Sequence, residues 1–536
     1  MAQGKKTIML HEGLDNYPID YRDVIRPYSN IDSISRILEP FFKEVILMLQ
    51  DSSAYVGAGS NRRLQNLDLG DIAAENEISL LRNCFVATGQ FQMAKQGHKR
   101  IVVGRKGSGK TAIFFKILDH YSGRLSHLIV DLKPEGHQFL KLRETVLTKL
   151  SPGLQEHSMT AFWHYILLLE IAHKIVNHEE NISLRDTHTR NLFDKVRSAF
   201  EDQFGNEQGD FSERLLKLVE DIAMRYQKCP QVLQTAHVTE LIYKHDIRKL
   251  YDALTDYLEV KDEVWVIVDN LDKGWPIKGA TTEDILILKG LLSATRKMQR
   301  EWEKRNIEFK SLVFIRNDIY DHLIKNTSDR EKDTAITLDW DDSELFKQMI
   351  LSRITNSTKM EGPFDEIWMK YFDPLITGEH SFGYIIDRTL MRPRDVLKFV
   401  QGAYEIAINR NHDKVSEEDI IQAEKTYSED LLQNISFELA DVFPGYPNIT
   451  YEFIGCPQVL NYATVTTILT RAGIAPADVS IMLSVLIWFG FIGIVKNGTP
   501  KYSYEVHYAL PKLSIDEKSI FVIHPAFRKA LECVFV

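Results

Sequence analysis

The 536-residue chain has few cysteines, and no two of them are spaced as a pair. They are Cys84, Cys229, Cys456 and Cys533, and no CxxC motif joins them. Such a sparse and scattered set supports neither a disulfide framework nor a zinc site, and it fits a reducing compartment. We therefore expect a cytoplasmic protein.

Long apolar runs are also scarce. The N-terminal stretch MAQGKKTIMLHEGLDNYP lacks the apolar core that a signal peptide needs. The longest uncharged run, Val479 to Val495, only touches the lower limit for a membrane span and contains serines and glycines. We therefore expect no association with a membrane.

An excess of positive charge is absent as well. Lys and Arg number 65 against 75 Asp and Glu, which gives a formal net charge of -10. This balance argues against a protein that holds nucleic acid by bulk electrostatics. With 44% apolar and 26% charged residues, the chain has the composition of a globular protein of about three domains.

The most specific motif is GRKGSGKT at residues 104–111, which matches the phosphate-binding pattern G-x-x-x-x-G-K-[ST]. A β-branched run precedes it and a helical pattern follows, as this loop requires. Its glycines let backbone N–H groups turn toward phosphate oxygens, Lys110 reaches the β- and γ-phosphates, and Thr111 ligates Mg²⁺. The residues expected to bind ATP here are Gly104, Arg105, Lys106, Gly107, Ser108, Gly109, Lys110, Thr111 and Ala112.

A second motif follows the buried run VWVIV at 264–268. Asp269 comes directly after it, where such sites place the carboxylate that holds Mg²⁺, although a turn-capping aspartate is the alternative. Asn270 stands where many ATPases have a glutamate that polarises the attacking water, and an amide does not accept that proton. We therefore expect slow or conditional ATP hydrolysis, unless Asp272 substitutes.

The remaining patterns indicate an α/β protein. Short apolar runs at 99–103, 127–132, 264–268 and 311–316 alternate with helical patterns, which is typical of a parallel sheet covered on both faces. Only helical patterns occur between the second and third runs. Helices are also predicted at 33–50 and at 72–95, with Asp71 as N-cap, and a loop at 15–31.

The order of these parts resembles an AAA+ ATPase of the origin-recognition/STAND-like kind, and more closely a family of bacterial P-loop ATPases. The matching segments are residues 104–114, 264–275, 311–318, 338–354, 391–400 and 414–432. The resemblance implies an AAA+-type P-loop core with a parallel sheet. The implied domains are an N-terminal extension with an amphipathic helix (1–70), the core (71–340) with a helical insertion at about 139–260, a helical lid (341–435) and a winged-helix-like domain (440–536).

The resemblance also implies residues that sense the nucleotide. Arg316 and Asn317 fall at the sensor-1 position, and Arg392 and Arg394 fall at sensor 2 in the lid, where a guanidinium suits phosphate. A surface or salt-bridged arginine is the alternative for each. Arg330 is a candidate intersubunit finger, although a solvated charge run explains it better.

The C-terminal residues 453–536 have a pattern of their own. Helices are predicted at 463–472 and 476–488, followed by hairpin strands at 491–495 and 502–507 around Asn497-Gly498. This order is similar to a winged helix. Residues 477–490, which would include the recognition helix, contain no Lys or Arg. We therefore expect this domain to contact protein rather than DNA.

The function implied by the resemblance is an ATP-binding switch with ATP and Mg²⁺ as cofactors. The switch would control oligomerisation or a separate effector protein, with bacterial anti-phage defence as its context, and DNA is the less favoured partner. The alternative is a DNA-associated ATPase resembling origin-recognition or transposition helper proteins. A third hypothesis is a nucleotide binder that never turns over.

Overall fold

The structure is a computed structural model that describes residues 64–134, 152–184, 186–204, 210–227, 247–271, 281–325, 335–443, 445–446, 448–506 and 514–534, with 9–12 and 25–28. The chain divides into two units, Met1–Gln65 and Asn66–Val536. In the first unit, β1 (Met9–Glu12) pairs in parallel with β2 (Ile25–Tyr28), so the loop predicted at 15–31 is wrong in part. The helix predicted at 33–50 lies outside the described residues, as do Asp272 and Arg330.

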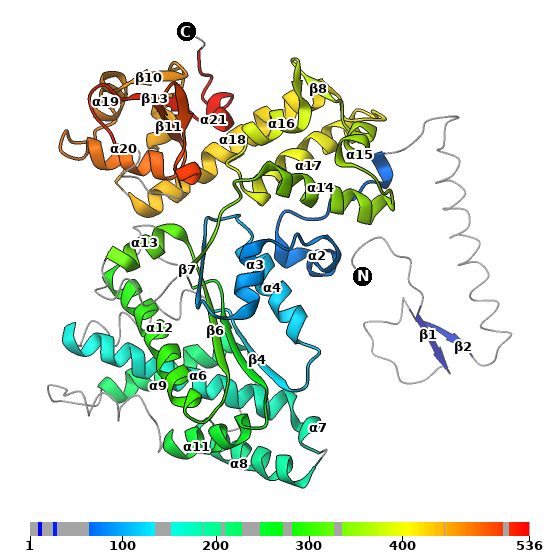
Figure 1. Cartoon of the computed structure of the whole chain (residues 1–536), viewed down its shortest axis with the longest axis vertical. Helices are drawn as coiled ribbons and strands as arrows, with labels where there is room; N and C mark the ends of the chain where they lie inside the picture. The colour runs from blue at the N-terminus through cyan, green and yellow to red at the C-terminus, as the bar shows by residue number, and fades with distance from the viewer. Residues whose placement is uncertain are drawn as a thin grey trace. The chain divides into compact units, whose positions relative to one another are not determined.

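The second unit contains a five-stranded sheet in the order β4-β5-β6-β3-β7, in which every pairing is parallel (Figure 1). The strands are β3 (Ile101–Gly104), β4 (His127–Leu132), β5 (Glu263–Val268), β6 (Phe309–Ile315) and β7 (Ala335–Leu338). Strand β3 lies between β6 and β7, so β5 is two strands away from it. The α/β class and the parallel sheet of a P-loop core are confirmed, and β7 is a strand that the sequence pattern missed.

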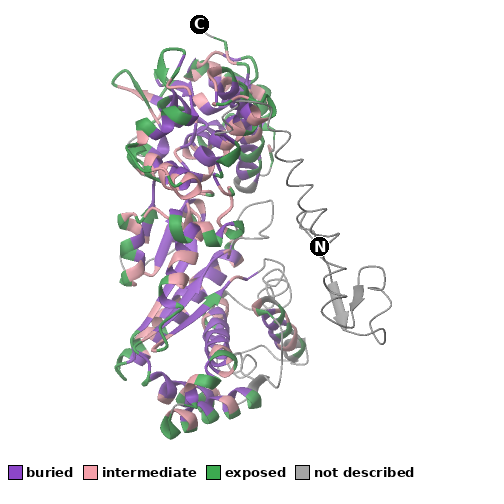
Figure 2. Cartoon of the chain, turned by 90° about the vertical axis from the view of Figure 1, so that its right-hand side faces the viewer, coloured by how far each residue is buried: buried purple, intermediate pink, exposed green. Residues whose placement is uncertain are grey.

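Both faces of this sheet are buried (Figure 2). Val102 and Ile267 belong to a core shared with α3 (Gly89–Gln96) and α4 (Lys110–Tyr121) on one face. Val103 and Val266 point the other way, into a larger core shared with α12 (Thr282–Glu303) and the insertion. Successive side chains of a strand alternate between faces, so continuously apolar strands need helices on both sides.

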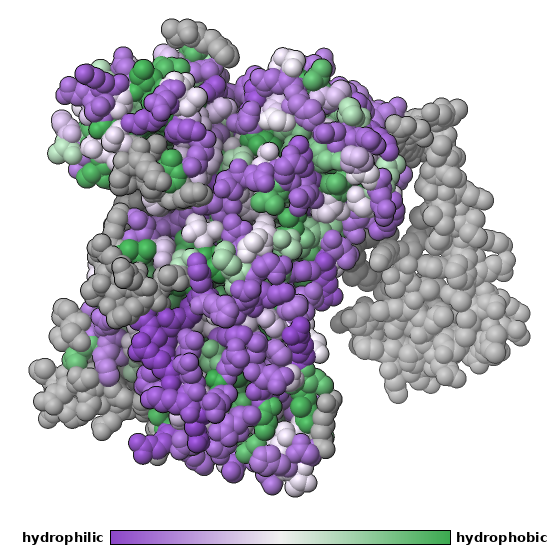
Figure 3. Space-filling model, viewed as in Figure 1, coloured by the Kyte–Doolittle hydropathy of each residue, from purple (hydrophilic) through white to green (hydrophobic). Residues whose placement is uncertain are grey.

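Every secondary-structure element that the structure describes between β4 and β5 is a helix, as predicted. Its helices are α6 (Pro152–His178), α7 (Glu180–Ser183), α8 (Thr187–Phe204), α9 (Phe211–Gln227) and α11 (Ile247–Leu258). Their apolar sides join the larger core. Figure 3 shows mostly hydrophilic side chains on the outer face of this region.

The single helix predicted at 72–95 is wrong. The chain instead forms η2 (Leu64–Asn66), η3 (Ala74–Asn76), α2 (Ile78–Cys84) and α3. Asp71 accepts from the Ala73 N–H in a turn, so it does not cap a helix. Between α2 and α3, residues 85–88 are not helical. The Thr88 hydroxyl accepts from the Phe91 N–H and is the N-cap of α3, a position that threonine favours over a helix interior.

The lid is helical, as the resemblance implies. After α13 (Asn317–Lys325) and β7, its elements are α14 (Ser343–Thr358), α15 (Phe364–Tyr371), β8 (Leu375–Ile376), β9 (Glu379–His380), α16 (Ser381–Asp387), α17 (Pro393–Asn409) and α18 (Glu417–Val442). Ser416 and Asp419 form a capping box that begins α18.

The C-terminal part contains a four-stranded antiparallel sheet in the order β10-β13-β11-β12. Its elements are η5 (Ile449–Phe453), β10 (Val459–Asn461), α19 (Tyr462–Arg471), α20 (Val479–Trp488), β11 (Ile492–Lys496), β12 (Thr499–Lys501), η6 (Ser503–Val506), β13 (Ile520–Ile523) and α21 (Pro525–Arg528). Both predicted helices are present, and the hairpin turns at Asn497 and Gly498, whose φ angles are 53° and 81°.

Two strand expectations in this part need correction. The strand predicted at 502–507 includes η6, whose start is held by the Glu505 carboxylate accepting from the Tyr502 N–H. Strands β10 and β13 were not predicted. The winged-helix identity itself stays a prediction. The uncharged run at 479–495 is α20 followed by β11, and within the described ranges no helix has the length and apolarity for crossing a membrane.

Candidate nucleotide-binding site

The loop between β3 and α4 has the backbone that its glycines predict. Gly107 and Gly109 have φ angles of 84° and 94°, which side chains rarely tolerate. A Cβ atom on Gly104 would lie 2.4 Å from the Ser108 Oγ, and one on Gly107 would lie 3.1 Å from the Arg394 Cβ. Helix α4 begins at Lys110, so its positive N-terminal end faces the loop.

The three residues expected to carry the chemistry lie together. The Lys110 Nζ donates to the Gly104 and Arg105 carbonyls at 2.8 and 3.1 Å, across the mouth of the loop. The Thr111 hydroxyl donates to the Asp269 Oδ2 at 3.1 Å. Asp269 is 3% exposed, and burial raises the pKa of its carboxyl against the opposing effects of the Asn270 N–H and Lys110. Two hard oxygen ligands therefore stand side by side at the loop.

Asn270 follows directly and has a φ of 63°. Asparagine tolerates this left-handed backbone better than most residues, which gives a structural reason for an amide at this position. Glutamate would carry strain of about 1–2 kcal/mol there. Asn270 thus stands in place of the water-activating glutamate of many ATPases, at a position where the left-handed backbone favours asparagine.

We expect basal ATP turnover well below the roughly 10 s⁻¹ of a median enzyme, because the Asn270 amide does not accept a proton from water. Asn270→Glu should raise kcat, and Asn270→Asp is the matched variant that supplies a carboxylate with less backbone strain. Steady-state phosphate release measures both. A wild-type rate near the median would contradict this argument.

A cavity of about 450 Å³ opens above the loop. Residues 106–113, Asp269, Asn270 and Arg316 line its polar side. Its apolar side comes from residues 72–86 and from the lid, and the main apolar residues are Ile72, Leu81, Phe85, Val86, Met349 and Leu397. None of these positions had a role in the site predicted from the sequence, although Met349 and Leu397 lie within the matching segments 338–354 and 391–400.

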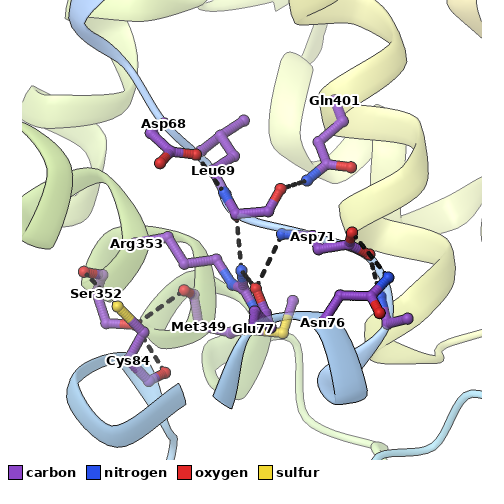
Figure 4. A network of polar contacts seen from close by, with 12 residues as sticks. Asp68, Leu69, Asp71, Asn76, Glu77, Cys84, Met349, Ser352, Arg353 and Gln401 are labelled. Atoms are coloured by element: carbon purple, nitrogen blue, oxygen red, sulfur yellow. Dashed lines mark hydrogen bonds and ion pairs between the residues drawn. The ribbon is translucent and has the colours of Figure 1, made fainter. Parts of the chain in front are cut away.

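A buried ion pair joins the two parts of the chain that form the apolar side of the cavity, the segment before α3 and the lid (Figure 4). The Arg353 Nη1, on α14, donates to the Glu77 Oε2 at 2.7 Å and to the Leu69 carbonyl at 2.6 Å. The two side chains of this pair are 4% and 6% exposed. Gln401 donates to the Gly70 carbonyl, and the Ser352 hydroxyl donates to the Cys84 carbonyl. The lid is thereby fastened to residues 69–84, which the sequence did not indicate.

The sensor candidates separate in space. Arg316 lines the cavity and donates to the Asp318 carboxylate at 3.1 and 2.8 Å. Arg394 also lines it, and its Cβ, Cγ and Cδ pack over Gly107. Asn317 is 7% exposed and borders a second cavity of about 20 Å³, where its Oδ1 has no hydrogen-bond partner among the described residues.

Arg392 also lies outside the main cavity. It is 5% exposed, donates to both oxygens of Asp395 at 2.6 and 3.2 Å, and has Glu438 3.7 Å away. This is the salt-bridged alternative that the sequence left open. A sensor role for Arg392 stays a prediction that its present partners do not favour.

Two aromatic residues contact the loop from other elements. The Trp340 Nε1, after β7, donates to the Ser108 carbonyl at 3.0 Å. The Arg105 guanidinium lies 4.9 Å from the centre of the Tyr504 ring and donates to the Met391 carbonyl at 3.1 Å. The phosphate-binding loop thus contacts both the lid and the C-terminal part directly.

Comparisons with known proteins add distant relatives. Residues 344–436 match the model of the FunZ-associated C-terminal helical domain. The chain is 24% identical over 481 residues to the putative transposon gamma-delta 80.3 kDa protein of Escherichia coli K12. That alignment covers 85% of this chain and 66% of the relative, so this chain spans just under two thirds of the relative's length. It is also 25% identical over 197 residues to allergen Alt a 2 of Alternaria alternata, covering 36% of this chain and 94% of that protein.

The solved structures to which this chain has a distant likeness include ORC2 and Cdc6p proteins. The Aeropyrum pernix ORC2 protein, in ADPNP–ADP complexes, is 12% identical, covering 83% of this chain and 91% of that one, with a TM-score of 0.37. Cdc6p of Pyrobaculum aerophilum is 10% identical, covering 90% and 95%, with a TM-score of 0.29. TM-scores this low mark distant likenesses and carry no inference about ligands or partners.

Proposed function

We propose that this protein binds ATP with Mg²⁺ in the 450 Å³ cavity and is a slow ATPase. The observation that carries the proposal is the Thr111–Asp269 contact, which joins residues 158 positions apart beside Lys110. Lys110 and the loop amides would hold the phosphates, and the apolar walls would take the base. When bound, Mg²⁺ would neutralise phosphate charge, and Thr111 and Asp269 are the residues that would hold it.

We further propose that the nucleotide controls contacts made by the lid and the C-terminal part. Arg394 of the lid packs on Gly107, and Arg105 of the loop contacts Met391 of the lid and Tyr504 of the C-terminal part. Phosphate that enters the loop would therefore change the contacts of the lid and of the C-terminal part. The Tyr504 hydroxyl is hydrogen-bonded to the buried His524 Nε2 at 2.8 Å, which extends this connection into the C-terminal core. Assembly with further copies of the chain fits such a switch.

The context of the switch needs revision. None of the reported relatives has a name that refers to anti-phage defence, so that hypothesis has no support. The E. coli relative is named for a transposon, a mobile DNA element. We therefore favour the alternative, a DNA-associated ATPase. Residues 477–490 contain no Lys or Arg. We therefore expect oligomers of the full chain to bind DNA, and not the C-terminal part alone.

Duplex DNA should raise the ATPase rate of the full-length protein severalfold at low salt, and the effect should shrink as salt screens phosphate contacts. Phosphate release at increasing DNA concentration measures it. Asp269→Asn is the control and should abolish turnover with or without DNA. Unchanged turnover at saturating DNA would reject DNA association, and tight ATP retention without turnover would select the third hypothesis.

A further inference from the structure

Two cysteines that are far apart in sequence lie on neighbouring backbone segments in the C-terminal part. Pro457 and Val534 form a parallel bridge. The Val534 N–H donates to the Cys456 carbonyl at 3.1 Å, and the Gln458 N–H donates to the Val534 carbonyl at 3.3 Å. In this register Cys456 stands opposite Cys533, one residue earlier on each segment.

This register suits a disulfide. Backbone segments that are paired by such hydrogen bonds lie about 4.7–4.9 Å apart. Disulfides need Cα atoms about 4.4–6.8 Å apart. Both thiols are free, and they lie within hydrogen-bonding reach of each other. The pair therefore needs little backbone movement to be bridged.

The two thiols also differ in exposure and in pKa, as the two members of a reactive pair do. Cys456 is buried, whereas Cys533 is partly exposed. The hydrogen bond from Cys456, aided by the nearby Arg528, lowers the pKa of the Cys533 thiol although burial opposes this. The same hydrogen bond and burial raise the pKa of Cys456. Cys533 is thus the accessible nucleophile and Cys456 the protonated neighbour.

We propose that Cys456 and Cys533 form a redox-active thiol pair, which hydroperoxides oxidise to an intramolecular disulfide. The Cys533 thiolate attacks the peroxide, the O–O bond breaks, and Cys533 becomes a sulfenic acid, while the leaving hydroxide or alkoxide takes up from solvent the proton that the Cys533 thiol had released. The Cys456 sulfur then attacks the Cys533 sulfur, the S–O bond breaks, and the hydroxide leaves as water with the Cys456 proton. Two thiols lose two electrons and the hydroperoxide gains them.

The bridge would join the last described segment covalently to the turn between η5 and β10, beside the hydrogen bonds that this segment makes with the lid. Ser428, on α18, donates to the Ala526 carbonyl at 2.7 Å and accepts from the Ala530 N–H at 3.0 Å. The Gly455 N–H donates to the Leu531 carbonyl at 2.8 Å, and Leu531 is fully buried. Residues 525–534 thus already contact both α18 and residues 455–458 between η5 and β10, and a disulfide would make the second of these connections covalent.

The test is thiol mapping of the full-length protein. Hydrogen peroxide treatment, thiol blocking, digestion and mass spectrometry should show loss of two thiols per chain and a Cys456–Cys533 linked peptide two hydrogens lighter than its parts. A thiol reductant should reverse the change. Cys84→Ser is the matched control, since Cys84 bonds to Ser352 elsewhere, and it should lose the same two thiols.

A second variant separates a resolving role from mere proximity. In Cys456→Ser, the sulfenic acid on Cys533 should persist and be trapped by dimedone, whereas the wild type should trap little because Cys456 consumes it. A wild-type protein that accumulates Cys533 sulfinic acid without the linked peptide, or that links Cys533 between chains, would overturn the proposal.

Discussion

Lys110→Ala lowers the affinity for ATP at least tenfold, equivalent to about 1.4 kcal/mol. The ammonium already sits within the loop, donating to the Gly104 and Arg105 carbonyls. On binding, the same donor would turn to the phosphates. Lys110 is the first residue of α4, so its side chain starts at the positive end of that helix. Isothermal calorimetry with ATP and Mg²⁺ measures the loss.

Lys106→Ala is the matched control for that experiment. Lys106 is in the same loop and lines the same cavity, but it is exposed and precedes the turn into α4. Removing its charge should weaken binding much less. Equal losses in the two variants would indicate a general electrostatic effect, and wild-type affinity in Lys110→Ala would reject the site.

Arg353→Ala should loosen the segment at 69–84 from the lid and weaken ATP binding with it. The change leaves the Glu77 carboxylate buried without its partner, which costs about 3–5 kcal/mol. The Leu69 carbonyl also loses its donor. Hydrogen exchange at residues 69–84 should accelerate by about two orders of magnitude or more.

The double variant Glu77→Leu/Arg353→Met shows whether charge burial causes that effect. Replacing both partners removes the unpaired charge, and apolar residues of similar volume often restore stability. Exchange at 69–84 should return most of the way to the wild-type rate. If the single and double variants exchange alike, the ion pair is not what fastens this segment.

How far prediction from the sequence succeeded depended on whether the signal was local. The loop at 104–111 was predicted because one short motif specifies a strand, a turn and a helix start, and Asp269 because it ends a buried apolar strand. Strand β7 is only four residues long and β10 only three, and neither has beside it a motif like the one that marks the equally short β3. The break at 85–88 was missed because Thr88 is compatible with a helical pattern, although it is a better N-cap of the next helix than an interior residue.

The sequence by itself determined the α/β class, the phosphate-binding loop and the carboxylate beside it, since each depends on residues adjacent in the chain. Only the tertiary structure decided which arginine faces the cavity: Arg394 packs on the loop, while Arg392, two residues earlier, is held by Asp395 and Glu438. It also brought Arg353 to Glu77 and Cys456 to Cys533, pairs separated by 276 and 77 positions. Burial, partner and register arise from packing between distant segments, and no spacing within one segment encodes them.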